Sequence, residues 1–320
     1  MLVCMLSCMQ YFRYCIHKIS ARVSSNGAEH PDLKWARWME TFVIAVLSAL
    51  SLISILALVS IGMAIIFGMM NVINLAHGEF LTIGAYTAAL ATALTGSFWI
   101  GLALAPLVGA AAGLAMEVSI IRHLYRRPID TIIATFGISL IIQKTLELTF
   151  GPSPIGVADP LAGPVEILGV TYPLYRIFLI VFALAVVGVV LLVFHRTNLG
   201  LDLRSTIQDS DMAAALGVDV ARTYRIAFAA GAGLAALAGA LIAPITATVP
   251  GMGLAYLIKS FFVVIVGGMG SILGVVTGST FIGGFETAFS VELGGAFPQA
   301  LVLVLAIVVV RLRPKGLVSS

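Results

Sequence analysis

The sequence has few charged residues, and this scarcity excludes most classes of soluble protein. Among 320 residues only 10% are Asp, Glu, Lys or Arg, whereas a typical globular domain has about 25%. Hydrophobic residues make up 60% of the chain, and its mean hydropathy is +1.08. Disorder is excluded as well, because disordered chains are polar and highly charged. So much apolar surface must face lipid, which predicts an integral membrane protein.

Cysteine is absent after the first 15 residues, which excludes a disulfide framework across the fold. Cys4, Cys8 and Cys15, followed by His17, have a loose spacing that differs from the usual zinc-ligand patterns. We therefore predict no metal site. A secretory signal peptide also fits poorly, because no basic residue precedes the short apolar opening.

The sequence lacks the short motifs of common hydrolases and nucleotide-binding proteins. No G-x-S-x-G, H-E-x-x-H or C-x2-C motif occurs, and the carboxylates are too scattered to suggest an acid/base pair. No Gly-Lys dipeptide occurs, so a phosphate-binding loop is excluded. Nucleic-acid binding would need a basic stripe with aromatic residues, which is also missing. We expect neither catalysis nor a cofactor in this chain.

Long apolar runs follow a polar N-terminal arm. We interpret residues 1–40 as extramembrane, either a true extension or an over-called start, and they need not be ordered. Residues 41–320 form the membrane domain, with runs at 42–67, 79–95, 98–121, 131–150, 173–195, 225–247, 254–267, 271–291 and 296–311. The last runs are short and broken by glycine. The pattern predicts an all-α, polytopic membrane protein with about eight crossings, one or two runs being partial or re-entrant.

Basic residues are concentrated in three segments, which predicts an orientation. They lie at 122–127, at 195–225 and at 311–315, and such loops are typical of the cytoplasmic side. Residues 151–172 contain no Lys or Arg and fall between two of these clusters, so they should lie on the outer face. The C-terminus is then cytoplasmic. The side of the N-terminus stays open, because the number of crossings and the basic residues of the arm disagree.

A group of polar residues interrupts the apolar sequence before residue 80. These residues are Asn71, Asn74, His77 and Glu79. At membrane depth such side chains are costly unless they are paired or face water. One interpretation is a discontinuous helix that lines a cavity. The other is an interfacial cap, in which Asn74 or His77 closes one helix and opens the next.

Six ionisable residues stand alone in apolar surroundings: Glu117, Lys144, Glu147, Lys259, Glu286 and Glu292. Lys144 and Glu147 are three residues apart and can pair on one helix face. Lys259 has no charged neighbour close to it in the sequence. We expect its ammonium group to reach an interface, as is typical of a single lysine in an apolar helix.

Glycine and polar residues mark two further segments. Gly270, Gly274 and Gly278 are spaced by four, which predicts one helical face for close packing against a neighbouring helix. Residues 200–218 form the longest polar stretch after the arm. There Asp211 is expected to cap a short amphipathic helix that ends at Gly217. Such a helix suits docking onto a cytosolic partner, and the alternative is an ordinary connecting loop.

Four sequence stretches indicate a protein family more specifically than the amino-acid composition does. They are FGMMNVINLAHGEFLTIGAY at 67–86, G-x3-R…AAALG at 200–217, FFVVIVGGMGSILGVVTG at 261–278 and RPKGL at 313–317. In order and spacing, over about residues 42–317, they resemble the LivH-type permeases of bacterial ABC importers for branched-chain amino acids. Close relatives of those permeases import urea and short-chain amides.

The resemblance implies a permease subunit in a bacterial inner membrane that translocates branched-chain or other hydrophobic amino acids. In that family two homologous permease subunits form the pore, two ATP-binding subunits drive it, and a periplasmic binding protein delivers the solute. By analogy residues 197–224 are the coupling loop, and the ATPase would contact Arg204, Asp211, Ala213, Ala214 and Gly217. The solute pathway would be lined by Asn71, Asn74, His77 and Glu79.

Three alternatives stay open at this stage. The solute could be urea or a short-chain amide. The chain could also be a channel or facilitator that conducts a small polar solute without ATP, in which case the loop at 200–217 would have no docking role. A purely structural membrane scaffold would not explain polar residues at broken helices.

Overall fold

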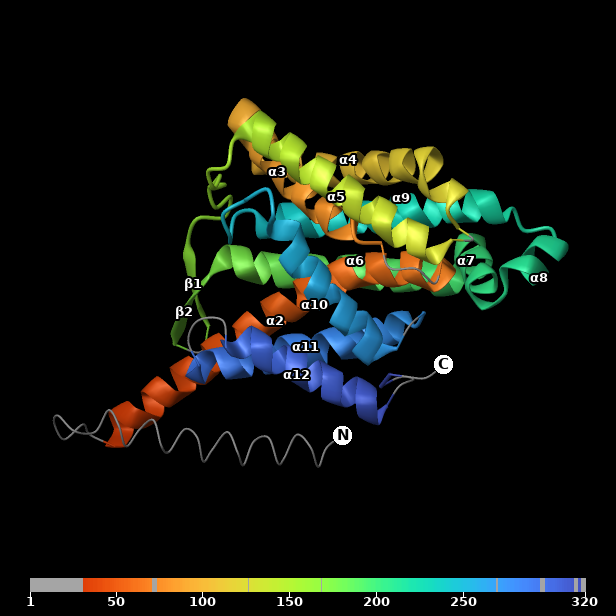
Figure 1. Ribbon diagram of the computed structural model, residues 1–320. Coiled ribbons are helices and arrows are strands. Elements are labelled where there is room, and N and C mark those ends of the chain that lie inside the picture. Colours follow the sequence, from red (N-terminus) through yellow and green to blue (C-terminus); the bar gives the residue numbers. More distant parts are fainter. Residues whose placement is uncertain are drawn as a thin grey trace. The chain divides into compact units, whose positions relative to one another are not determined.

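The computed structural model is almost entirely helical (Figure 1). The described residues are 31–70, 74–125, 127–167, 169–268, 270–293, 297–313 and 316–317. The chain consists of two compact parts, residues 1–44 and 45–320. Of the expected polar arm, residues 1–30 lie outside the described residues, and residues 31–40 are helical. The predicted all-α fold is confirmed.

Nine long helices are present among the described residues. They are α2 (Pro31–Met70), α3 (His77–Thr95), α4 (Phe98–Ser119), α5 (Pro128–Phe150), α6 (Leu174–Arg196), α9 (Val220–Ile242), α10 (Met252–Gly267), α11 (Ile272–Glu292) and α12 (Phe297–Leu312). Each coincides with one predicted apolar run, although α2 begins well before residue 42. Within the described residues, six helices are long and apolar enough to cross a membrane, and α10 and α12 are shorter apolar helices.

Smaller elements join the long helices. The turn η1 (Ile121–His123) lies between α4 and α5, and helices α7 (Asn198–Gln208) and α8 (Ser210–Ala215) lie between α6 and α9. The strands β1 (Pro164–Ile167) and β2 (Val170–Pro173) form an antiparallel hairpin between α5 and α6. The hairpin was not expected from the sequence, and it is the one sheet among the described residues.

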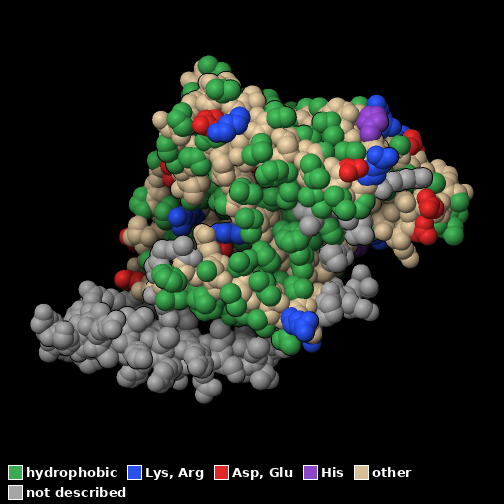
Figure 2. All heavy atoms as spheres, in the orientation of Figure 1, with side chains coloured by type: hydrophobic (Ala, Val, Ile, Leu, Met, Phe, Trp, Pro, Cys, Tyr) green, Lys and Arg blue, Asp and Glu red, His purple; other side chains and the backbone are tan. Residues whose placement is uncertain are grey.

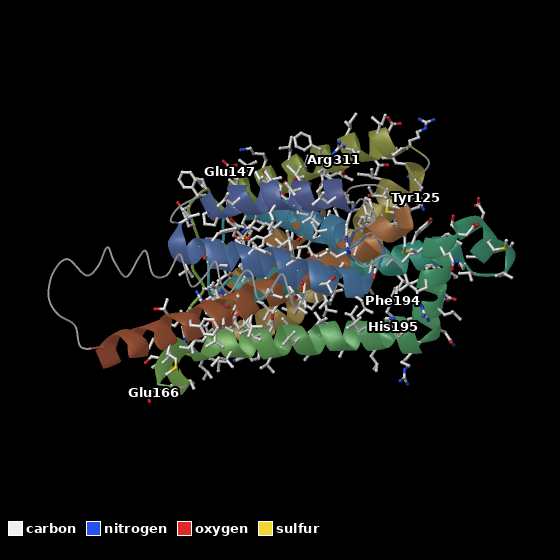
Figure 3. All side chains as sticks on the ribbon, turned by 90° about the horizontal axis from the view of Figure 1, so that it is seen from below. Tyr125, Glu147, Glu166, Phe194, His195 and Arg311 are labelled. Atoms are coloured by element: carbon white, nitrogen blue, oxygen red, sulfur yellow. The ribbon has the colours of Figure 1, made fainter. Side chains whose placement is uncertain are left out.

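Most of the described connections in residues 45–320 lie at two ends (Figure 1). The turn η1, α7 and α8 lie at one end, called here the α7–α8 end, and the strands lie at the opposite hairpin end. Figure 3 places His195 toward the first end and Glu166 toward the second. The basic segments 122–127 and 195–225 therefore share one end, and residues 151–172 lie at the other. This is the segregation that the charge pattern predicts.

The outer helices expose apolar side chains. Only 17% of an apolar 18-residue stretch of α5 is buried inside the fold. Ile133, Ile141 and Leu148 of this helix are exposed. Val181 and Leu192 of α6 are exposed as well. On the face shown in Figure 2, charged side chains are few and scattered. Large exposed apolar surfaces of this kind are the surfaces that contact lipid in a helical membrane protein.

Helix α9 lies at the centre of the fold, and backbone contacts surround it. In α9, 72% of an apolar 18-residue stretch is buried inside the fold, and this buried fraction is the largest among the six candidate spans. Gly231 packs against the Gly62 carbonyl of α2, and a Cβ atom on Gly239 would overlap the Leu81 carbonyl oxygen of α3. Gly84 of α3 packs equally closely on the α9 backbone. Small residues allow this approach, which drives helix association in lipid.

The predicted glycine face of α11 is correct for two residues and wrong for the third. Gly274 lies against the backbone of Gly267, and a Cβ atom on Gly278 would overlap the Val263 carbonyl oxygen of α10. Gly270, however, precedes the helix, and its φ is +84°. The helix begins only after Ser271, whose side-chain oxygen accepts a hydrogen bond from the Gly274 N–H and thereby caps the N-terminus.

The α3–α9 contact predicts that Gly84→Ala destabilises the fold. A Cβ atom there would overlap backbone atoms of Ala236, which cannot rotate away. We expect a loss of about 1–3 kcal/mol, measured as a lower thermal unfolding temperature in detergent. The matched control is Gly137→Ala in α5, where a Cβ atom meets nothing within 4 Å. Equal unfolding temperatures for the two variants would contradict this packing.

Candidate solute pathway and coupling segment

Helix α3 begins inside the helical bundle. The His77 Nε2 atom lies 3.2 Å from the Val59 carbonyl oxygen of α2. Val59 precedes Met70, the last residue of α2, by eleven residues, which is about 16 Å of helix. The His77 ring therefore lies beside α2 at a point about 16 Å before the end of that helix, which is about half of the hydrocarbon thickness. The discontinuous-helix interpretation requires an interruption of this kind.

Helix α10 begins at the same place. Gly78 and Gly253 touch, and a Cβ atom on either glycine would overlap the carbonyl of the other. The first turns of α3 and α10 therefore lie against each other, and neither has a side-chain cap. The N-terminus of a helix carries a partial positive charge and free N–H groups. Two of these termini meet beside α2, and the contact of His77 places them near Val59.

Asn74 and His77 lie at the interruption and are incompletely hydrogen-bonded. Both are buried, and the Asn74 Oδ1 atom accepts a hydrogen bond from the Ala76 N–H at 3.0 Å, as a helix cap would. The Asn74 Nδ2 and His77 Nδ1 atoms have no partner among the described residues. With Phe67 the two side chains line a pocket that leaves no room for a water molecule. The fourth predicted residue, Asn71, lies outside the described residues.

Glu79 faces a different helix, so the predicted polar residues do not form one cluster. Its Oε1 atom accepts hydrogen bonds from Ser139 Oγ at 2.9 Å and Gln143 Nε2 at 2.7 Å, both in α5. Its Oε2 atom is buried without a partner in the described part of the chain. Two residues along a helix correspond to about 200°, so His77 points to α2 and Glu79 to α5. The polar pair Ser139 and Gln143, one turn apart on an apolar helix, was the signal missed in the sequence.

The short helix α8 is capped differently from the prediction. The Asp209 Oδ1 atom accepts hydrogen bonds from the backbone N–H groups of Asp211 at 3.0 Å and Met212 at 2.9 Å. Asp209 is therefore the N-cap, and the expected cap at Asp211 is wrong. The predicted end is confirmed, because Gly217 follows the helix with φ +91°, a conformation that favours glycine.

Helix α8 presents apolar side chains outward. Met212 is 58% exposed and Leu216 77% exposed, and Ala214 is exposed beside them. Ala213, by contrast, is only 2% exposed, so it faces inward and is not part of an outer docking surface. The exposed surface of α8 is thus more apolar than the alanine-rich face expected from the sequence.

Arg204 also turns inward. Its guanidinium lies 5.8 Å from the centre of the Phe194 ring, and its Nε donates a hydrogen bond to the Gly200 carbonyl at 3.2 Å. The contact with Phe194 holds α7 onto the end of α6, and the hydrogen bond to Gly200 lies within α7. Arg204 therefore stabilises the base of the candidate coupling segment, and its charged group is not presented at the tip.

Helix α7 lies close to the end of α2 and to the start of α11. A Cβ atom built on Gly68, near the end of α2, would lie 3.6 Å from the Ile207 side chain. A Cβ atom built on Gly270, just before α11, would lie 3.7 Å from the same side chain. A cavity of about 490 Å³ opens here, lined by Phe67, Gly68, Met69, Thr206, Ile207, Gln208, Asp209, Ser210 and Gly270. Ile207, which sequence reasoning missed, thus touches the ends of two helices at once.

Most of the isolated ionisable residues have partners. The Glu117 Oε1 atom accepts a hydrogen bond from the Tyr125 hydroxyl at 2.6 Å. Burial raises the pKa of Tyr125, and the bond to Glu117 raises it further, so the hydroxyl stays a donor. Lys144 and Glu147 pair as predicted. Lys259, expected to be alone, lies 2.6 Å from Glu286 of α11.

Comparison with known proteins places the chain in a family. The sequence model of the family described as "Branched-chain amino acid transport system / permease component" matches residues 45–312. The chain belongs to this family. It is therefore a permease component of a transport system, and it is a multi-pass membrane protein rather than an enzyme.

Relatives of the permease family match over most of the chain. The permease protein BraD of Pseudomonas aeruginosa is 28% identical over 81% of this chain and 90% of its own length. LivH of Salmonella typhimurium is 27% identical over 87% and 96%, and LivM of the same species 30% identical over 80% and 66%. All three are named as permease proteins of a high-affinity branched-chain amino acid transport system. No solved structure matches the chain.

Proposed function

We propose that the chain is the membrane-spanning permease subunit of an ATP-driven ABC importer for branched-chain or other hydrophobic amino acids. One observation carries the proposal: the exposed apolar helix α8 is linked, through Ile207 of α7, to the end of α2 and to the start of α11. A facilitator that works without ATP has no need of this device. The sequence has no phosphate-binding loop, so ATP would be bound by separate subunits.

In the proposed mechanism α8 is the element on which the ATP-binding subunits act. Its exposed residues Asp211, Ala214 and Gly217 would meet the partner, with Met212 and Leu216 as apolar anchors. A movement of α8 passes to α7, whose base is fixed by Arg204, and then through Ile207 to Gly68 and Gly270. Because these two residues are glycines, the isoleucine rests close to the backbone, and backbone displacement follows directly.

The solute pathway is proposed at the break between α2 and α3. Asn74, His77 and Glu79 are buried there and keep polar atoms without partners in the described structure, and Asn71 completes the set. Buried polar groups are nearly always hydrogen-bonded, so a conformation in which water or solute reaches these atoms is favoured. The N-termini of α3 and α10 add their partial positive charges at the same place.

The proposed assembly contains a second permease. LivH and LivM of Salmonella typhimurium are both named as permease proteins of such a transport system, and this chain is similar to both. We propose a pair of homologous permease subunits with two ATP-binding subunits at the α7–α8 end, which would be cytoplasmic. A periplasmic binding protein would deliver the solute at the hairpin end, across a bacterial inner membrane.

Co-purification tests the proposal directly. The tagged chain is extracted gently from its native membrane, and every co-purifying chain is identified by mass spectrometry. We expect stoichiometric subunits with a Walker-type phosphate loop and a second permease. The solute carried by the accompanying binding protein would separate an amino acid from urea or a short-chain amide. A chain that purifies alone would contradict the proposal and favour the facilitator.

The coupling role of α8 predicts that Gly217→Val uncouples ATP hydrolysis from uptake. Valine is strained at φ +91°, so the end of α8 must distort. We expect at least a tenfold lower uptake in proteoliposomes while ATP hydrolysis continues. The control is Gly96→Val, a glycine with φ +71° and similarly open surroundings between α3 and α4. Equal losses in both variants would assign the effect to strain alone.

The pathway proposal predicts slower uptake for Asn74→Leu and for Glu79→Gln. Each change removes a buried polar or charged contact, and a hydrogen bond to a charged group is worth about 1.5–3 kcal/mol, or roughly 10–100-fold in rate. Uptake is measured at equal amounts of protein in the membrane, with the exposed Glu147→Gln as control. Unchanged uptake and unchanged stimulation of ATP hydrolysis would support the helix-cap interpretation instead.

A further inference from the structure

Lys259 and Glu286 form an ion pair between two apolar helices. The Lys259 Nζ atom of α10 lies 2.6 Å from the Glu286 Oε1 atom of α11, and the side chains are 21% and 11% exposed. The other ion pairs in the described part of the chain join residues three apart, and their side chains are 38–74% exposed. The pair between α10 and α11 is therefore different in kind.

Both charges lie within apolar helices, away from the helix ends. Lys259 precedes Gly267, the end of α10, by eight residues, and Glu286 follows Ile272, the start of α11, by fourteen. At 1.5 Å per residue these are about 12 Å and 21 Å of helix, within a hydrocarbon layer of about 30 Å. Charged side chains at such depth are rare, and they almost always face the bundle interior or a water-filled cavity.

The pair is partly exposed, and aromatic residues lie close to it. Ala255, one turn before Lys259, is small and exposed, and Phe289, on the Glu286 side of α11, is partly exposed. The Tyr256 ring centre lies 6.0 Å from the Lys259 Nζ atom. The charges can thus be reached from one side, and apolar surface lies next to them.

We infer that Lys259 and Glu286 are a binding subsite for a zwitterionic amino acid. The α-carboxylate of the solute accepts hydrogen bonds from the Lys259 ammonium, and its α-ammonium donates to the Glu286 carboxylate. An apolar solute side chain then lies against the aromatic residues. The inference rests on the proposed function and names the chemistry of its solute, and the pair is separate from Asn74, His77 and Glu79.

Charge balance favours this ligand over the alternatives. A zwitterion brings one charge of each sign, so the site is neutral both when it is empty and when it is occupied. In the empty state the two side chains satisfy each other, which removes the large cost of an unpaired charge in the membrane. Urea or an amide has no charges with which to replace either partner, so it would gain little by separating the pair.

The competing explanation is a structural ion pair that only joins α10 to α11. Two double variants separate the explanations. In Lys259→Met/Glu286→Gln both charges are removed, which leaves no unpaired charge to unfold the protein. In Lys259→Glu/Glu286→Lys the pair is kept but reversed. The matched control is Lys144→Met/Glu147→Gln, which removes the exposed pair of α5 at the same 2.6 Å separation.

The experiment measures ATP-driven uptake of L-leucine by the full complex in proteoliposomes, together with ATP hydrolysis and the thermal unfolding temperature. For the neutral variant we expect at least a tenfold lower leucine uptake per ATP hydrolysed, with the unfolding temperature retained. The reversed pair should not restore uptake, because it would turn the solute side chain away from Tyr256. The control variant should match the wild type.

The outcomes distinguish this inference from the proposed function. If the wild-type complex takes up no leucine with ATP, the proposed function fails and the inference with it. If the wild type transports leucine and the neutral variant transports it equally well, only the inference is overturned. Restored uptake in the reversed pair would also overturn it and leave a structural ion pair.

Discussion

The close approach of helix backbones at glycine is the constraint on which the rest of the structure depends. Between helices in lipid the hydrophobic effect contributes little, so association rests on close packing and hydrogen bonds. Around α9 this packing is made by Gly231 on Gly62 and by Gly239 on Leu81. These contacts fix α2 and α3 against α9, and the contact between Gly78 and Gly253 then brings the first turns of α3 and α10 together.

A helix that starts inside the bundle buries polar side chains, and the neighbouring helices supply hydrogen bonds to only some of them. Ser139 and Gln143 of α5 donate to Glu79, but Asn74 Nδ2 and His77 Nδ1 have no partner among the described residues. Groups of this kind oppose a single closed conformation, because any rearrangement that admits water or solute stabilises them. The interruption therefore supplies a physical reason for the bundle to open.

Much of the fold could be predicted because the thickness of a bilayer fixes the length of an apolar run. Contacts between residues that are distant in the sequence could not be predicted. The partner of Lys259 lies 27 residues away, and no local pattern indicates it. Asp209 and Asp211 both have the chemistry of a cap, and only the backbone geometry selects Asp209. The opposite directions of His77 and Glu79, by contrast, follow from helix geometry and could have been derived.

In the proposed mechanism the coupling segment and the subsite act on the same pair of helices. Gly270, beside Ile207, leads directly into α11, which carries Glu286, while α10 carries Lys259. The two helices meet near the α7–α8 end through bare backbone at Gly274 and Gly278, which can serve as a pivot. A displacement of α7 that changes the angle between α10 and α11 also changes the distance between Lys259 and Glu286. In the proposed mechanism, ATP-driven motion and the separation of the ion pair are thus one movement.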